Sequence, residues 1–176
     1  MRLATLMTTA TVMMLGTIAL ANTVTYDFDK TTDFSRFRTY AWVSGTNLED
    51  ELNHKRVVNA IDGQLASKGL RRVESGAPSD LLVAYHASVD KNLQINASSS
   101  GWGPYGLGGS RFGTVRAQEI FVGTLVVDMV DASTRSIVWR GSASTDINVK
   151  ASAEKREKNV NQAAEKLFKN YPPKKK

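Results

Sequence analysis

The chain has 176 residues, of which 41% are hydrophobic and 23% charged, and it contains no cysteine and two histidines. This length and composition are typical of one globular domain and exclude disordered, collagen-like and multidomain chains. The lack of cysteine excludes disulfide scaffolds, thiol nucleophiles, zinc fingers and lipid-modified cysteines. The sequence does not define a biochemical activity, but it indicates a destination and a fold.

The first 21 residues are typical of a signal peptide. Arg2 follows the free amine, residues 3–26 carry no charge, and the apolar run 12–20 leads into Ala19-Leu20-Ala21. Small residues at 19 and 21 suit a signal peptidase, so we predict cleavage after Ala21 and a periplasmic or secreted product. The alternatives are a membrane anchor, which needs about 20 mostly apolar residues, or a buried helix.

We therefore expect a signal peptide over 1–21, a single domain over 22–173 and a basic tail over 174–176. The formal net charge of +6 is concentrated near the end: residues 150–176 hold nine Lys or Arg and three Glu, whereas residues 22–149 hold 13 basic and 14 acidic side chains. A nucleic-acid partner is not predicted, because the body lacks a basic stripe with stacking aromatics. The basic segment is either a solvated helix face or a weak contact for an anionic envelope surface.

Alternation of apolar and polar residues predicts strands at 24–28 and 38–43. The spacing from Thr46 to Glu49 is that of a capping box and predicts the start of a helix. Lys68 and Gly69 suit its end. The same pattern places His54 on the exposed side of this helix.

A short strand is predicted at 70–73 and a long one at 81–95, whose odd-numbered residues would be buried and whose His86 would project from the opposite face. A glycine-rich connection over 97–114 separates it from a strand at 115–130. That strand is apolar on both faces, which predicts either an inner strand covered on both sides or a bulge near Gly123.

A hairpin loop at 131–135 precedes a strand at 137–147, and Ser152 suits the start of a final helix. The complete order is β-β-α-β-β-β-β-α. Strands joined by hairpins favour a mainly antiparallel sheet. The predicted fold class is therefore α+β, a two-layer sandwich with two amphipathic helices on one face of the sheet.

Several motifs have the letters of a known chemical site but lack its context. The letters of 101–106 match the dinucleotide pattern G-x-G-x-x-G, but Pro104 removes an amide and no helix follows. Neither histidine has the context of a serine hydrolase. Asp27, Asp29 and Asp33 lack the remaining ligands of a calcium loop. No catalytic, cofactor-binding or metal-binding residue is predicted.

Asp128 and Asp131 bracket a hairpin, where aspartate commonly caps backbone amides. A pair of glycosidase carboxylates is the alternative for these two residues. Trp102, Tyr105 and Phe112 add aromatic surface to the glycine-rich connection. Such a loop either contacts a ligand or partner, or is a disordered excursion. These three aromatics and His86 are the candidate contact residues.

Four segments resemble one known family: 26–29 with 33–42, 79–85, 123–131 with 137–141, and the closing 171–173. The family is the bacterial domain of unknown function 4136, found in envelope proteins and lipoproteins. The resemblance covers about residues 24–173 and implies an α+β envelope protein without a known activity. Many members resemble lipoproteins, whereas Asn22 stands here where a lipid-accepting cysteine would be. Structural roles under the sheet fit Trp42, Trp139 and Gly141.

Three hypotheses of function follow. The first is a non-enzymatic exported protein that binds an envelope component or protein partner. The second is a small hydrolase or ligand-processing enzyme whose site forms only in the fold, with His86 beside a buried carboxylate. The third is an assembly subunit that presents an exposed sheet edge.

Overall fold

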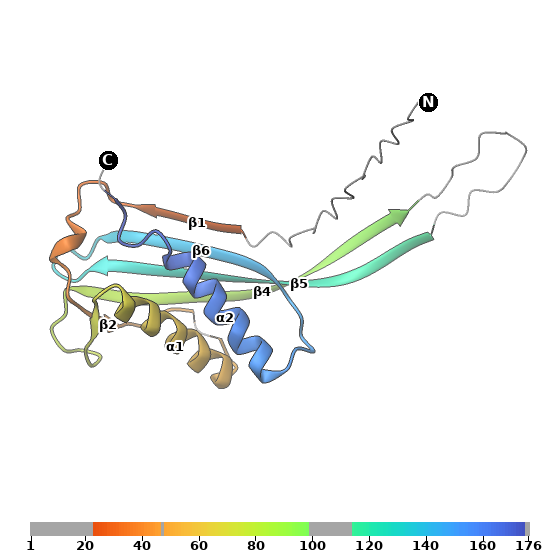
Figure 1. The fold of residues 1–176 in the computed structure, drawn as a ribbon, viewed down its shortest axis with the longest axis horizontal. Coiled ribbons are helices and arrows are strands. Elements are labelled where there is room, and N and C mark those ends of the chain that lie inside the picture. Colours follow the sequence, from red (N-terminus) through yellow and green to blue (C-terminus); the bar gives the residue numbers. More distant parts are fainter. Residues whose placement is uncertain (1–22, 47, 99–113, 175–176) are drawn as a thin grey trace, which may run out of the picture.

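The structure is a computed structural model that describes residues 23–46, 48–98 and 114–174, of which 93–98 and 114–118 are described by their backbone alone (Figure 1). Within these ranges a sheet carries two α-helices and a short 3-10 helix. The elements in chain order are β1 (Thr23–Phe28), η1 (Phe34–Arg36), β2 (Thr39–Trp42), α1 (Glu51–Ser67), β3 (Arg71–Arg72), β4 (Leu81–Ser98), β5 (Thr114–Asp131), β6 (Ile137–Ile147) and α2 (Ala153–Phe168).

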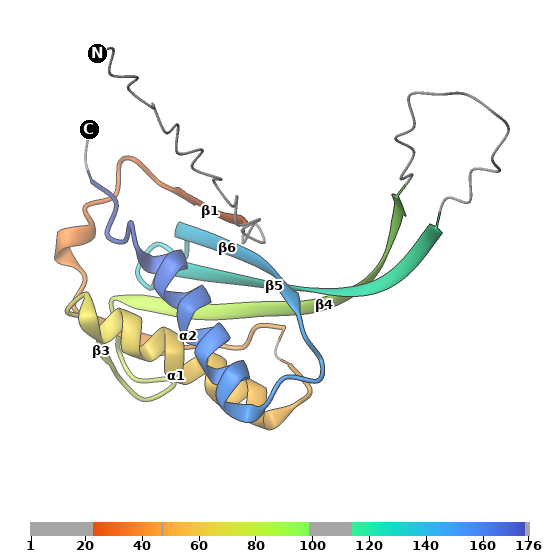
Figure 2. The same ribbon diagram turned by 45° about the vertical axis from the view of Figure 1, so that its right-hand side comes forward.

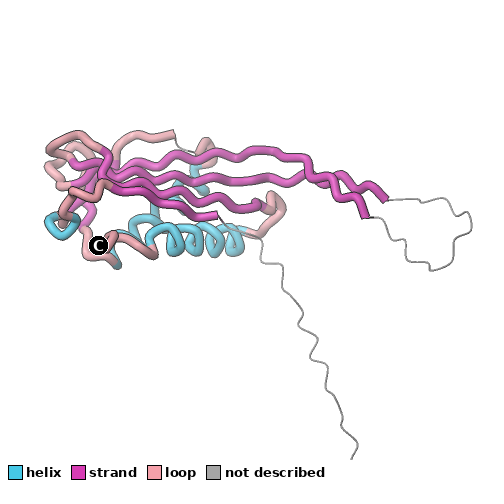
Figure 3. Tube along the Cα trace, turned by 90° about the horizontal axis from the view of Figure 1, so that it is seen from above, coloured by secondary structure: helices cyan, strands magenta, loops and turns pink. Residues whose placement is uncertain are grey.

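The six strands form one mixed sheet in the order β1-β6-β5-β4-β2-β3. Neighbours from β1 to β4 are antiparallel, and β2 is parallel to both β4 and β3. The parallel pair arises because α1 connects β2 to β3 as a crossover helix. Both helices lie on the same face of the sheet (Figures 1 and 3). The predicted α+β class and element order are confirmed.

The core lies between this face and the helices. Trp139 of β6 is 1% exposed and stacks on Phe168 of α2 with ring centroids 5.1 Å apart. A Cβ at Gly141 would lie 2.4 Å from the Trp139 ring and 2.8 Å from Leu167. A glycine is therefore required where the helix approaches the strand. The structural roles predicted for Trp139 and Gly141 are confirmed.

The predictions for β5 were wrong in two respects. Its odd-numbered residues Leu125, Val127 and Met129 are buried, but Val126 on the opposite face is only half-buried because no helix covers that face. The register shift lies between Met129 and Val130 rather than near Gly123. The apolar residues on both faces reflect an apolar strip on the uncovered side, not a second layer.

The predicted start of α1 was also wrong. The helix begins at Glu51, and its N-cap is Asp50, whose carboxylate accepts from the backbone N–H groups of Leu52 and Asn53. Thr46 does not cap the helix because it lies alongside the edge of β4. There its backbone carbonyl accepts a hydrogen bond from the N–H of Ala87. A tertiary contact has replaced the local capping pattern. The predicted cap of α2 at Ser152 is confirmed.

Burial of the inner face of β4 ends earlier than predicted. Leu81, Val83 and Tyr85 are buried, whereas Val89 is 50% exposed. The helices and the flanking strands stop near this point, and β4 and β5 continue together beyond them (Figure 2). None of the helices within the described ranges is long and apolar enough to cross a bilayer.

Candidate functional site

His86 lies on the uncovered face of the sheet, as predicted. Its Nδ1 accepts from the backbone N–H of Thr46 at 3.1 Å and lies 3.0 Å from the Thr46 hydroxyl. Its Nε2 lies 3.7 Å from a carboxylate oxygen of Asp128. The loop after β2, strand β4 and strand β5 therefore bring a hydroxyl, an imidazole and a carboxylate together.

Asp128 is the buried member of this group, at 5% exposure. It was predicted to cap a hairpin, but it lies within β5, opposite Arg140 of β6. Arg140 donates to both carboxylate oxygens, from Nε at 2.5 Å and from Nη2 at 2.7 Å. The Asp128 hydrogen bonds and charge raise the pKa of Arg140. The negative charge of Asp128 is thus balanced by a bidentate ion pair with Arg140.

This arrangement is not organised for proton abstraction. A base needs a free nitrogen aimed at the reacting proton, and Nδ1 of His86 already receives the Thr46 amide. The 3.7 Å separation from Asp128 is longer than a hydrogen bond. His86 stands beside a buried carboxylate, as the enzyme hypothesis requires, but Arg140 holds that carboxylate. The cluster fastens the loop after β2 to the sheet.

The prediction that His54 lies on the exposed side of its helix was wrong. It is half-buried, and its Nδ1 lies 2.5 Å from the hydroxyl of Tyr85, which reaches α1 from the inner face of β4. The backbone N–H of Leu48 donates to the same hydroxyl at 3.4 Å. Burial raises the pKa of the Tyr85 phenol. These contacts hold the start of α1 against the sheet.

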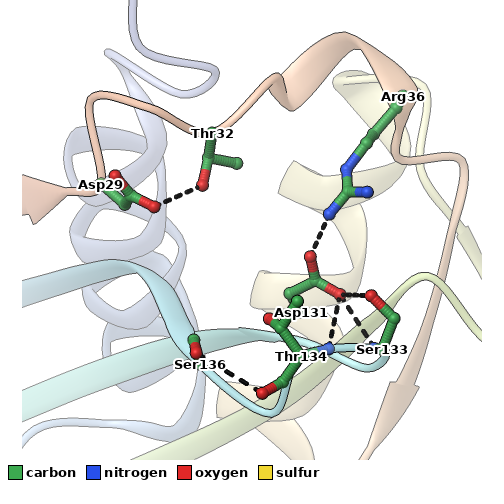
Figure 4. Close-up of polar contacts among 7 residues, drawn as sticks. All are labelled: Asp29, Thr32, Arg36, Asp131, Ser133, Thr134 and Ser136. Atoms are coloured by element: carbon green, nitrogen blue, oxygen red, sulfur yellow. Dashed lines mark hydrogen bonds and ion pairs between the residues drawn. The ribbon is translucent and has the colours of Figure 1, made fainter.

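A pocket of about 440 Å³ lies where β1 and β5 end (Figure 4). Asp131 is 3% exposed and receives the guanidinium of Arg36 on one oxygen. Its other oxygen accepts from the Ser133 hydroxyl at 2.6 Å and the Ser133 amide at 2.9 Å. These hydrogen bonds, above all that from the hydroxyl, hold the pKa of Asp131 below its usual range. Asp131 therefore caps its hairpin, as predicted.

The other carboxylates at this pocket are used in the same way. Asp29 accepts from the amide and hydroxyl of Thr31 and from the hydroxyl of Thr32, and these contacts lower its pKa. Asp33 accepts from Ser35. The described ranges contain no group of three or more His, Cys, Asp or Glu residues placed to hold a metal ion. The acidic side chains that line this pocket accept hydrogen bonds from residues of their own turns and so stabilise those turns.

A second pocket of about 410 Å³ opens at the β3 edge of the sheet, below the end of α1. Asp62 of α1 accepts there from the Tyr40 hydroxyl at 2.6 Å, from Trp42 Nε1 at 2.9 Å and from Arg72 at 2.8 Å. Burial, together with Asp62, raises the pKa of Tyr40. Arg71 and Arg72 give the rim of this pocket a positive charge.

The most distinctive feature is the arm, defined here as residues 88–98 of β4 and 114–120 of β5. Their pairing continues to Ser98 opposite Thr114, whereas β6 ends at Ile147 opposite Phe121 and β2 ends at Trp42 opposite Val83. Residues 92–98 and 114–120 of the arm therefore form a two-stranded ribbon without a neighbouring strand among the described residues, whereas residues 88–91 pair with 121–124 of β5, which β6 flanks (Figures 1 and 2). Lys91 and Glu119 form an ion pair across it at 2.7 Å.

The predicted contact residues are divided between two places. His86 lies on the sheet close to the base of the arm. Trp102, Tyr105 and Phe112 belong to the connection between β4 and β5, outside the described residues. The structure does not bring His86 into either pocket. Asp62 and Arg140 were not found by sequence reasoning, because their partners come from distant strands.

These features define a two-layer α+β domain with a projecting hairpin. The model of the family called domain of unknown function (DUF4136) matches residues 24–173, and the chain belongs to this family. The resemblance found in the sequence is confirmed. No curated protein matches the chain.

Three solved structures illustrate the fold. A PDZ domain protein from Parabacteroides distasonis is 14% identical with a TM-score of 0.58, over 87% of this chain and 36% of that one. The PelC dodecamer from Paraburkholderia phytofirmans is 12% identical with a TM-score of 0.53. The match covers 84% of this chain and 95% of the PelC chain. A DUF4136 family protein from Bacteroides thetaiotaomicron is 16% identical with a TM-score of 0.52. The match covers 86% of this chain and 96% of the Bacteroides chain.

At these identities the likeness concerns the fold alone. The chain spans about a third of the length of the Parabacteroides protein, whose coverage is 36%.

Proposed function

We propose that this chain is a non-enzymatic binding protein of the bacterial envelope and that the arm contacts its partner. The observation that carries the proposal is the arm itself. An isolated two-stranded ribbon is at best marginally stable in water, and this one extends past both helices and all other strands of the described residues. The outer edges of such a ribbon can form hydrogen bonds and side-chain contacts when it binds another molecule.

The composition of the arm supports the same function. Val89 is 50% exposed at the base of the arm. The predicted contact residues Trp102, Tyr105 and Phe112 belong to the connection that joins its two strands. Exposed aromatic and aliphatic side chains carry much of the energy of binding sites. A protein partner can add a strand to a free edge of the ribbon while its side chains meet these groups.

The envelope location rests on the leader and the family. We propose that residues 1–21 are removed as a signal peptide, that 22–173 form the domain and that 174–176 remain as a basic tail. The basic carboxyl-terminal segment then provides a weak contact with anionic surfaces. PelC, which shares the fold, is described as a dodecamer, and this favours protein partners over small ligands.

Capture from envelope extract tests the arm as the contact. The processed chain is compared with Val89→Lys in the arm and with Val149→Lys in the loop after β6, because both valines are 50% exposed. We expect the arm variant to lose at least about 90% of the captured partner, a tenfold weakening, and the loop variant to retain it. Equal capture by the two variants would refute the proposal.

The rival function is a small hydrolase that uses His86. Its contacts with Thr46 and Asp128 are the observation in its favour. The Thr46 amide on Nδ1 and the Arg140 ion pair stand against it. Any turnover that Thr46→Val and His86→Gln both abolish, with the fold retained, would favour the enzyme instead.

A further inference from the structure

We propose that copies of this chain associate head to tail through the two outer edges of the sheet, β1 of one copy adding to β3 of the next. These strands are the first and last in the sheet order, and neither has an outer neighbour among the described residues. Unpaired edges are templates for another strand. The proposal uses no residue of the arm and does not depend on the function proposed for it.

The β1 edge presents outward-facing backbone groups and one aromatic ring, and of these groups the N–H of Phe28 donates to the carboxylate of its neighbour Asp27 at 2.9 Å. The N–H of Asp29 donates to the carbonyl of Val138 in β6. Because backbone groups alternate along a strand, those of Tyr26 and Phe28 face outward. Tyr26 is 42% exposed, and its side chain lies on the face that carries the helices. The edge is thus a free strand with a protruding ring.

The β3 edge presents the complementary features. The N–H of Arg71 donates to the carbonyl of Arg38, and that of Val73 donates to the carbonyl of Tyr40. The backbone of Arg72 therefore faces outward. The pocket of about 410 Å³ opens beside it on the helix-bearing face. This volume accommodates a tyrosine ring next to the Arg72 guanidinium, a favourable cation-π geometry.

The strand directions allow the two edges to join. The strand direction reverses three times from β4 through β5 and β6 to β1, so β1 runs opposite to β4. Strands β2 and β3 run parallel to β4. A second copy in the same orientation therefore places its β1 antiparallel to β3. The sheet then continues from copy to copy without a change of direction.

Alternation also fixes which charges meet. Outward-facing Arg72 can lie opposite Val24, Tyr26 or Phe28, and Arg71 then lies opposite Thr25, Asp27 or Asp29. The last two of these three registers pair Arg71 with an aspartate, and Arg71, Arg72, Asp27 and Asp29 are all exposed. Seating Tyr26 at the pocket selects the register in which Arg71 faces Asp27. Opposite charges on facing strands stabilise such a pair.

Charge also favours a head-to-tail contact over a two-fold one. Two β3 edges facing each other would oppose the arginines of one copy with those of the other, which is destabilising. A contact between two β1 edges would leave the pocket and both arginines unused. The occupant that fits the β3 edge is therefore the β1 edge of a second copy, and the assembly is a closed ring or an open filament.

Sedimentation velocity of the exported, natively processed chain tests the contact. We expect self-association as the concentration rises from about 1 µM to about 1 mM. Arg71→Glu and Asp27→Lys should each weaken it at least tenfold, because each places like charges across the contact. Lys158→Glu, a matched reversal on the exposed surface of α2, should leave it unchanged.

A mixture of the two edge variants identifies the head-to-tail geometry. In Arg71→Glu the β1 edge is intact, and in Asp27→Lys the β3 edge is intact, while the two altered edges carry opposite charges, so the mixture should regain the self-association that neither variant shows alone. Tyr26→Ala should weaken association without altering the circular dichroism spectrum. A wild-type chain that stays monomeric, or a mixture of the two variants that does not associate, would overturn the proposal. Val89→Lys should still associate, which separates this test from that of the arm.

Discussion

Asp62 of α1 receives hydrogen bonds from two side chains of β2 and one of β3. In Asp62→Ala the Tyr40 hydroxyl and the Trp42 indole lose their acceptor within a partly buried site. We expect the free energy of unfolding to fall by about 2–3 kcal/mol, measured by urea denaturation. Asp90→Ala on the exposed arm should change it by less than about 0.5 kcal/mol. A loss equal in both variants would contradict this role.

Two glycines differ in the space around them. A Cβ at Gly45 would lie 2.0 Å from the backbone oxygen of Tyr85, whereas nothing lies within 4 Å of a Cβ at Gly63 in α1. Gly45→Ala should destabilise the fold by at least about 2 kcal/mol, because backbone must move. Gly63→Ala should stabilise it by about 0.5–1 kcal/mol. Thermal unfolding of both variants checks the opposite signs.

Asp131 gives the fold a dependence on acid pH. Its pKa is held below the usual range by the Ser133 hydroxyl, by backbone amides and by Arg36. The unfolded chain therefore binds the proton more tightly, and the stabilisation is complete above about pH 4 and is lost as the pH falls through the folded pKa.

The variant Asp131→Asn isolates this contribution. Its free energy of unfolding should be lower than that of the wild type at neutral pH, and the difference should narrow below about pH 4. Urea denaturation at several pH values measures the difference. A gap of constant size from neutral to acid pH would show that the Asp131 charge does not contribute.

At the scale of elements, local sequence patterns were enough to predict the bounds of a strand or helix wherever one periodicity extended through the whole segment. The bounds of β6 were predicted from alternation alone, and Ser152 marked the start of α2. The start of α1 could not be predicted, because Thr46 is drawn to β4 by contacts with His86 and Ala87. The parallel pairing of β2 depends on a crossover that no local signal specifies.

The candidate site was less accessible to sequence reasoning than the fold. His86 was singled out correctly as a residue of the uncovered face, but its partners Thr46 and Asp128 come from other elements. The even-numbered valines of β5 suggested a second layer, because periodicity shows that a face is apolar and not what lies against it. The two strands that lead to the glycine-rich connection were predicted from their sequences, but not that they extend beyond the rest of the sheet.

Shortening the arm tests its independence from the core. Residues 91–121 are replaced by Asn-Gly, a favoured two-residue hairpin turn, between Asp90 and Val122, which pair across the strands. Because the arm buries little apolar surface, the melting temperature should change by less than about 4 °C. Partner capture should be lost in the same variant. A large drop in melting temperature would show that the arm belongs to the folding unit.

At the scale of the whole molecule, export decides which partners the domain meets. We expect the protein recovered from the periplasm to begin at Asn22, as measured by intact mass. Ala21→Arg should block cleavage and leave a longer, membrane-associated species, because a signal peptidase accepts small residues at this position. A cytosolic protein with an intact amino terminus would contradict the proposed location.

The arm also has a consequence for how this domain diversifies. Beyond Ser88 the arm extends for ten more described residues of β4, about 33 Å at the usual rise of a strand. Substitutions at that distance do not disturb the packing between helices and sheet. With the proposed role of the arm in binding, its sequence is free to change while the packing of the scaffold is retained.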